Sequence, residues 1–90
     1  MRYAFDSRKR AANLKKHGFD FKDASQVIES DRVVTFEDRR FDYGEQRFVT
    51  LGMLRGVVVA IATAESDDEI WVISMRKAHH HEEEIYYRNL

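Results

Sequence analysis

The stretch Ile70-Trp71-Val72-Ile73-Ser74-Met75-Arg76-Lys77-Ala78 carries the strongest strand signal in the chain. Side chains alternate between the two faces of a strand, which divides this stretch into two sets. The sets are Ile70, Val72 and Ser74 on one face, and Trp71, Ile73 and Met75 on the other. Because both sets are largely apolar, we expect this segment to lie in the middle of a sheet that is covered on both sides.

Two cations, Arg76 and Lys77, end this predicted strand, and a charged segment follows them. A strand buried in a sheet can hold an arginine rigidly, and rigidly held arginines suit the binding of a polyanion such as RNA. The alternative is that Arg76 is the polar end of a core strand and pairs with a carboxylate. On the residues alone both interpretations stay open, although structural ion pairs are the commoner of the two.

The composition is that of a small globular protein. Ninety residues fit a single domain, residues 1–90, with one modest core. The absence of cysteine excludes disulfides and thiolate metal sites and suits a cytoplasmic protein. We find neither an apolar run of membrane-helix length nor the apolar core of a signal peptide. The net charge of −1 argues against coating of nucleic acid through bulk charge, although residues 1–18 are basic.

Hydrophobic periodicity and capping residues predict three helices and four main strands. The helices are expected at residues 7–17, 21–29 and 78–90. The strands are expected at residues 32–36, 47–54, 57–64 and from residue 70 onward, with a further short strand at residues 2–5. Short turns between successive strands indicate an antiparallel meander. We therefore predict an α+β fold in which two N-terminal helices and one C-terminal helix pack on one face of a four-stranded antiparallel sheet.

Two groups of polar residues are candidates for chemistry. His17 lies at the end of the first predicted helix, where it can transfer protons or simply be a surface histidine favoured by the helix dipole. The polar loop between the first two main strands carries Arg39, Arg40 and Glu45 and leads to Arg47. Charged loop residues on a rigid scaffold are typical of binding sites, but these arginines can equally pair with the carboxylates of the loop.

The C-terminal segment holds two further candidates. His79, His80 and His81 are consecutive, so on a helix they point about 100° apart and cannot all bind one metal ion. Pairs such as His80 with Glu84 supply only two ligands, so no metal site is predicted. Tyr86 lies at the spacing of a packed helix face, where core packing is the default role and contact with a base or phosphate is the alternative.

A series of short motifs spans nearly the whole chain. The motifs are Phe5-Asp6, Asn13, Lys16-His17-Gly18 and Phe21, then Asp42, Gly44-Glu45 and Arg47, then residues 73–78, and finally Tyr86 or Tyr87. In this order they resemble the BrnT family of toxins, whose members often read WD…N..KHG..F, D.GE.R and IISARKA before a late tyrosine. Phe5 and Met75 depart from these patterns, and Ala64-Glu65 stands where many members carry a basic residue.

The resemblance implies a RelE-like fold and an endoribonuclease toxin of a type II toxin–antitoxin system. Its antitoxin would be BrnA-like, with a ribbon-helix-helix domain, and the pair would contact DNA only through that domain. We expect a heterotetramer in which two antitoxin chains dimerise and each holds one toxin, with no membrane and no cofactor involved. The competing interpretation is a non-enzymatic binding module that acts as a co-repressor with its partner.

The resemblance also favours specific roles for charged residues. RNA carries its own nucleophile, the 2′-hydroxyl, so cleavage needs a base, an acid and a cation but no metal. Arg76 is expected to stabilise the transition-state charge and Arg47 to hold a phosphate. His17 and Glu45 are the expected proton-transfer residues, in an unassigned order. The expected RNA-binding residues are Lys16, Arg39, Arg40, Lys77 and Tyr86.

Overall fold

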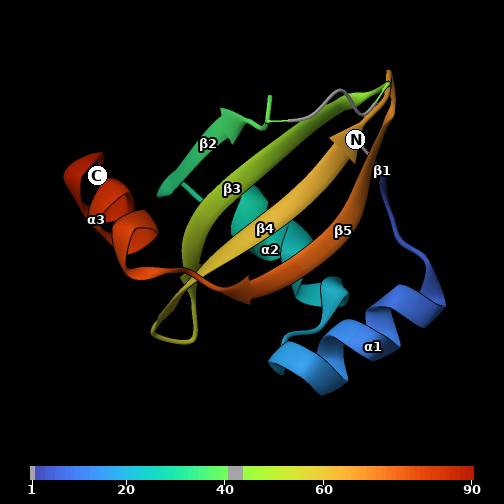
Figure 1. The fold of residues 1–90 in the computed structure, drawn as a ribbon, viewed down its shortest axis with the longest axis horizontal. Coiled ribbons are helices and arrows are strands. Elements are labelled where there is room, and N and C mark those ends of the chain that lie inside the picture. The colour runs from blue at the N-terminus through green and yellow to red at the C-terminus, as the bar shows by residue number, and fades with distance from the viewer. Residues whose placement is uncertain (1, 41–43) are drawn as a thin grey trace.

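The computed structural model describes residues 2–40 and 44–90, so Asp42 of the sequence motif lies outside the described residues. Figure 1 shows the helices and strands that the described residues form. They are β1 (Arg2–Ala4), α1 (Ser7–His17), the short 3-10 helix η1 (Phe21–Asp23), α2 (Ala24–Ile28), β2 (Val33–Glu37), β3 (Gln46–Leu54), β4 (Val57–Glu65), β5 (Glu69–Lys77) and α3 (His80–Arg88). The predicted α+β class is confirmed, and none of the described helices is long and apolar enough to cross a membrane.

The sheet has five strands in the order β1-β5-β4-β3-β2. Strands β2 to β5 form the predicted antiparallel meander, and Arg55 and Gly56 make the tight turn between β3 and β4 with positive φ angles of 49° and 80°. The prediction of a four-stranded, purely antiparallel sheet is wrong, because β1 adds a fifth strand that runs parallel to β5. A strand of three residues shows too little alternation for its partner to be identified from the sequence.

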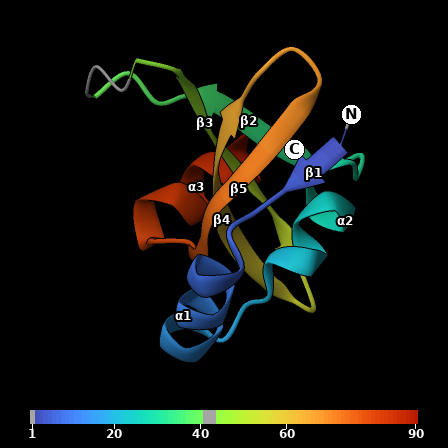
Figure 2. The ribbon, with the colours of Figure 1, turned by 90° about the vertical axis from the view of Figure 1, so that its right-hand side faces the viewer.

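Helices cover both faces of the sheet, whereas the sequence predicted cover on one face only. Figure 2 shows α2 and α3 on opposite sides of the strands. On the α2 side, one core cluster includes Phe21, Val59 and Met75. On the α3 side, a second cluster includes Leu51 and Tyr86. Strand β4 is apolar on both sides, so each side needs its own cover.

A β-bulge in β5 changes which of its residues face outward. The pairing of β4 with β5 skips Ile73, which is an extra residue in β5. An extra residue reverses the alternation beyond it, so Val72 and Met75 both reach the core cluster on the α2 side. Trp71 instead lies on the α3 side and is 43% exposed. The predicted grouping of Trp71 with Met75 is therefore wrong, and so is the prediction that the segment forming β5 is covered on both of its sides.

The ends of the helices follow their capping residues. Asp6 accepts two backbone N–H groups at the start of α1, and Gly18, with a φ of 79°, ends the helix as predicted. The helix predicted at residues 21–29 forms as η1 followed by the short α2. Helix α3 starts at His80 and not at Ala78, because the N–H of Ala78 still bonds to a carbonyl of β4 at 2.9 Å.

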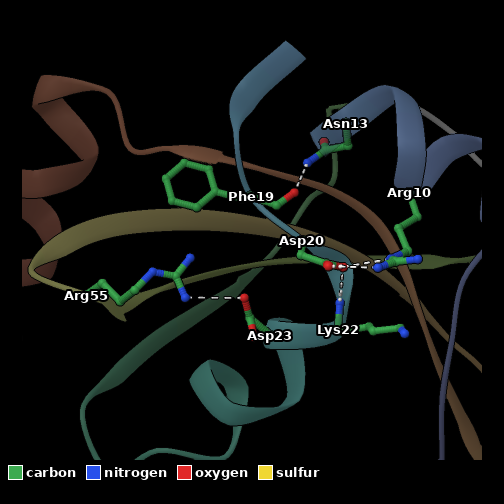
Figure 3. A network of polar contacts seen from close by, with 7 residues as sticks. All are labelled: Arg10, Asn13, Phe19, Asp20, Lys22, Asp23 and Arg55. Atoms are coloured by element: carbon green, nitrogen blue, oxygen red, sulfur yellow. Dashed lines mark hydrogen bonds and ion pairs between the residues drawn. The ribbon is translucent and has the colours of Figure 1, made fainter. Parts of the chain in front are cut away.

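Asn13 fastens α1 to the edge of β5. Its side-chain amide donates to the carbonyl of Met75 at 2.9 Å and to the carbonyl of Phe19 at 3.1 Å, and its Oδ1 accepts the N–H of Met75 at 3.1 Å. The pairing of β1 with β5 ends at Trp71, so Asn13 provides partners for backbone groups beyond β1. Figure 3 shows the bond from Asn13 to Phe19.

A charged network joins α1 to η1, as Figure 3 shows. Arg10 donates to the two carboxylate oxygens of Asp20 at 2.7 and 2.8 Å, and the N–H of Lys22 donates to the same carboxylate at 3.0 Å. The hydrogen bonds from Arg10, above all, hold the pKa of the Asp20 carboxyl well below its usual range. Arg10 and Asn13 therefore connect α1 to its neighbours.

Candidate functional site

Part of the sheet on the α3 side is left uncovered. Strand pairing places Arg47, Ala64 and Trp71 in one row across β3, β4 and β5. Ala60 and Arg76 lie in a second row on the same side, where α3 begins to pack on the sheet. We call the uncovered part the open face, and its members are Phe36, Arg47, Ala62, Ala64, Trp71, Ser74 and Arg76.

Two adjoining hollows mark the open face. The first has a volume of about 370 Å³ and is lined by Lys9, Glu45, Arg47, Ala64, Glu65, Ser66, Trp71 and Ile73. The second has a volume of about 380 Å³ and is lined by Phe36, Glu37, Asp38, Arg39, Arg40, Val49, Arg76, His81, Glu82 and Ile85. Arg47 lines the first hollow and Val49, two residues later on the same side of β3, lines the second. The two hollows therefore lie next to each other on the same side of β3.

Arg76 pairs with a carboxylate and also lines a hollow. Its guanidinium donates to the two carboxylate oxygens of Glu82 at 2.7 and 3.1 Å, so pairing with a carboxylate is confirmed. The same side chain lines the second hollow and is 29% exposed. Glu82 comes from the first turn of α3 and also accepts the N–H of His79 at 2.8 Å.

The environment of Glu82 keeps its carboxylate charged. Its side chain is only 8% exposed. Burial raises the pKa of Glu82, but the hydrogen bonds from Arg76 and from the backbone of His79 outweigh burial and leave the pKa below its ordinary value. Because the carboxylate accepts both arms of the guanidinium, it fixes the direction in which Arg76 enters the hollow.

The other predicted arginines also have carboxylate partners. Arg47 contacts Glu45 at 3.1 Å at the first hollow. At the second hollow, the arginines at positions 39 and 40 contact carboxylates two residues earlier in the chain, at 2.8 and 2.9 Å respectively. Pairing within the loop, one of the two interpretations from the sequence, is therefore present. These pairs are exposed at least in part, so each contributes little to stability.

The structure separates the remaining predicted residues from the two hollows. His17 and Lys16 lie in the last turn of α1 and are not among the lining residues of either hollow, and Lys77 is an exposed residue at the end of β5. Tyr86 is 1% exposed, and its hydroxyl donates to the carbonyl of Arg32 at 3.0 Å. Core packing, the default interpretation, therefore describes Tyr86.

The histidines at the start of α3 form one of the pairs considered in the sequence, His80 with Glu84, and a second group that the sequence analysis did not consider. His79, His81 and Glu82 bring three ligand atoms within 4.8 Å of one another, and His80 contacts Glu84 at 2.9 Å. The Glu82 carboxylate already accepts three hydrogen bonds, two of them from Arg76. A metal ion there would compete with this guanidinium for the same oxygens.

Sequence reasoning missed several lining residues of the hollows. The sequence predicts Trp71 in the core and Phe36 only as the end of a strand, yet both are exposed on the open face. Glu82 had a usable signal, since residue 79 followed three positions later by a glutamate has the spacing of a capping box. Nothing in the sequence could have indicated that Lys9 of α1 reaches the first hollow.

Comparison with known proteins gives one family. Residues 5–82 match the model of a family described as ribonuclease toxin, BrnT, of type II toxin-antitoxin system. A search of curated proteins found no match. The family match spans α1, all of β2 to β5 and the start of α3, and so includes both hollows except the lining residue Ile85. The chain belongs to the BrnT family of ribonuclease toxins of type II toxin–antitoxin systems.

Proposed function

We propose that this chain is an endoribonuclease that binds RNA across the open face and cleaves it without a metal ion. The observation that carries the proposal is the placement of Arg47 and Arg76 on the same uncovered side of the sheet. Both are held by strands, and both line hollows. A rigid arginine with solvent access is suited to phosphate, because its guanidinium has five N–H groups and the carboxylate partner accepts only some of them.

The spacing of the two arginines suits an extended RNA strand. Their rows lie four residues apart along β4, which corresponds to roughly 13 Å, and they stand on strands that flank β4. Arginine side chains reaching inward from both rows can therefore contact neighbouring phosphates of one strand. Arg39 and Arg40, which line the second hollow, would extend this binding, and Lys16 and Lys77 would contact RNA that continues beyond the hollows. These backbone contacts would make binding sensitive to salt.

The proposed reaction needs only RNA and protein side chains. A base takes the proton of the 2′-hydroxyl, the 2′-oxygen forms a bond to phosphorus, and the bond from phosphorus to the 5′-oxygen breaks as an acid protonates that oxygen. Arg76 stabilises the extra negative charge of the phosphorane. Glu45 and His17 are the proposed proton-transfer residues. Glu45 is supported by its place beside Arg47, and His17 by the sequence motif alone.

The decisive experiment uses purified protein and RNA with and without a chelator. We expect cleavage that is unaffected by chelator and leaves a 2′,3′-cyclic phosphate and a 5′-hydroxyl. Arg76→Ala should lower the rate by on the order of a hundredfold or more, because a preorganised charge stabiliser is lost. Arg88→Ala, an exposed arginine elsewhere on α3, is the matched control and should cleave normally. Circular dichroism should show that both variants fold.

Two results would contradict this mechanism. One is cleavage that requires Mg²⁺ and leaves 5′-phosphates, and the other is full activity in a folded Arg76→Ala variant. The second candidate function, a co-repressor without enzymatic activity, is favoured by the carboxylate partners of the open-face arginines. Expression of the chain alone separates the two, because an active toxin arrests growth and a co-repressor does not.

The proposed partner is a BrnA-like antitoxin with a ribbon-helix-helix domain, through which alone the complex would contact DNA. The type II assignment of the family supports an antitoxin of protein nature encoded with the toxin. We propose that the toxin acts in the cytoplasm, where its RNA substrates are. No cofactor enters the proposed reaction, since the nucleophile is part of the substrate.

A further inference from the structure

Trp71 has no role in the reaction proposed above, yet it is placed on the open face. It is the single tryptophan of the chain, and it is 43% exposed. A large aromatic side chain exposed on a sheet and set in a hollow is more informative than an exposed aliphatic residue, because its ring offers a flat surface for stacking. The β-bulge at Ile73 is what turns Trp71 toward this side of the sheet.

The row that contains Trp71 is shaped to receive a flat ring. Arg47 and Trp71 stand on either side of Ala64, which is too small to fill the space between them. Arg47 and Trp71 are two strand spacings apart, a distance of about 10 Å. The resulting hollow of about 370 Å³ has Ile73 as a further apolar wall. A nucleobase fits a space of this width with one face on the indole.

The charges around the hollow fit a nucleotide better than an apolar ligand. Lys9 and Arg47 supply positive charge beside the ring, and phosphates flank every base of a nucleic acid strand. Glu65 supplies oxygens that can accept hydrogen bonds from the edge of a base. Phe36, 39% exposed in the adjoining hollow, is a second aromatic residue on the same face.

We infer that Trp71 is a stacking platform for one base of single-stranded RNA, with Lys9 and Arg47 binding the phosphates beside that base. The inference rests on the proposed function, because it needs RNA to cross the open face. Single-stranded RNA is the fitting substrate class, since a paired base cannot leave its helix to stack on a protein side chain without loss of its own stacking.

Intrinsic fluorescence tests the inference directly, because all tryptophan emission comes from residue 71. The probe is a short single-stranded RNA with 2′-O-methyl groups, which cannot be cleaved through the 2′-oxygen. We expect saturable quenching as this RNA is added. Trp71→Ala should weaken binding by roughly tenfold to a hundredfold, whereas Trp71→Phe should retain most of the affinity because it keeps an aromatic face. Binding to both variants is followed by anisotropy of a labelled RNA.

A matched control and an altered ligand sharpen the test. Tyr87→Ala removes another exposed aromatic residue, one that lies outside both hollows, and should bind RNA like the unaltered chain. An RNA in which one base is replaced by an abasic unit should bind the unaltered chain more weakly. The same replacement should make little further difference to RNA binding by the Trp71→Ala variant. This coupling is specific to stacking, because a general structural defect would weaken both RNAs alike.

The outcomes separate this inference from the proposed function. If the chain cleaves RNA but Trp71→Ala binds the probe as tightly as the unaltered chain, the stacking platform is refuted and the nuclease stands. If the probe quenches Trp71 and no RNA is cleaved, the platform stands and the nuclease is refuted. Loss of antitoxin binding by Trp71→Ala, with RNA affinity unchanged, would show that the hollow is a protein-docking site and would overturn the inference.

Discussion

Glu82 accepts three hydrogen bonds, two of them from the guanidinium of Arg76. A carboxylate with this pattern sets both the position and the plane of the arginine. Glutamine is nearly the same size but brings an NH₂ group to face the N–H groups of the guanidinium, so one contact becomes repulsive. Glu82 is thus a positioning residue in the proposed reaction, since it would act on RNA only through Arg76.

We predict that Glu82→Gln lowers kcat by roughly tenfold to a hundredfold, because a displaced catalytic group loses its alignment with the reacting atoms. KM for RNA should change less, since under the proposed mechanism other cations also bind the RNA backbone. Glu84→Gln, on an exposed part of the same helix, serves as control and should leave both constants unchanged. An unchanged kcat in Glu82→Gln, measured on folded protein, would show that Arg76 does not need this partner.

Arg76 could be selected from the sequence because it follows a long apolar run and forms part of a motif. The capping-box spacing marks Glu82, but the sequence could not show that Glu82 pairs with Arg76, since Glu82 belongs to another element and meets Arg76 only after the chain has turned into α3. For the same reason the sequence does not predict the first hollow. Its rim combines Lys9 of α1 with residues of the sheet, and periodicity describes one element at a time.

At the scale of elements, one amide side chain holds α1 against β5. Asn13→Ala would leave the buried N–H and carbonyl of Met75 without the partners that Asn13 supplies. We predict that this substitution lowers the free energy of unfolding by about 1–3 kcal/mol, the usual cost of an unsatisfied buried polar group. Alanine is the better helix former, so a loss cannot be attributed to helix propensity. Urea unfolding, followed by circular dichroism, measures the change in the free energy of unfolding.

Two comparisons show whether the loss of the Asn13 hydrogen bonds causes the predicted destabilisation. Asn13→Asp keeps an acceptor for the N–H of Met75 but lacks the donor for the carbonyl groups, so it should also destabilise the fold. Ala12→Ser, at the exposed neighbouring position of α1, should change stability by less than about 0.5 kcal/mol. An Asn13→Ala variant as stable as the unaltered chain would refute the role given to this side chain.

The sequence predicted the long elements well and the short or irregular ones poorly. Helix α1 was identified by Asp6 and Gly18, and the four main strands by their alternation. Strand β1 is too short to show a pattern, and its parallel partner lies at the far end of the chain. The bulge at Ile73 depends on how β5 is paired with β4, so it has no signature in β5 itself.

At the scale of the whole molecule, the prediction concerns assembly. Neutralising a toxin requires a durable complex, and durable complexes bury a large surface. We predict two toxin chains and two antitoxin chains, in which the antitoxins dimerise and each holds one toxin of 10.7 kDa. Light scattering of the co-expressed pair should give a mass equal to two copies of each chain. A stable particle with one copy of each would refute the predicted assembly.

The parallel pairing of β1 with β5 has a consequence for the order of events during synthesis. Arg2 pairs with Glu69, and Asn13 bonds to Met75, so β1 and α1 wait for β5, which the ribosome makes much later. Such distant pairings form slowly because a long loop must close first. Arg76 lies in the same late strand. Under the proposed mechanism, a nascent toxin is therefore harmless to the ribosome and message that produce it until translation has passed β5.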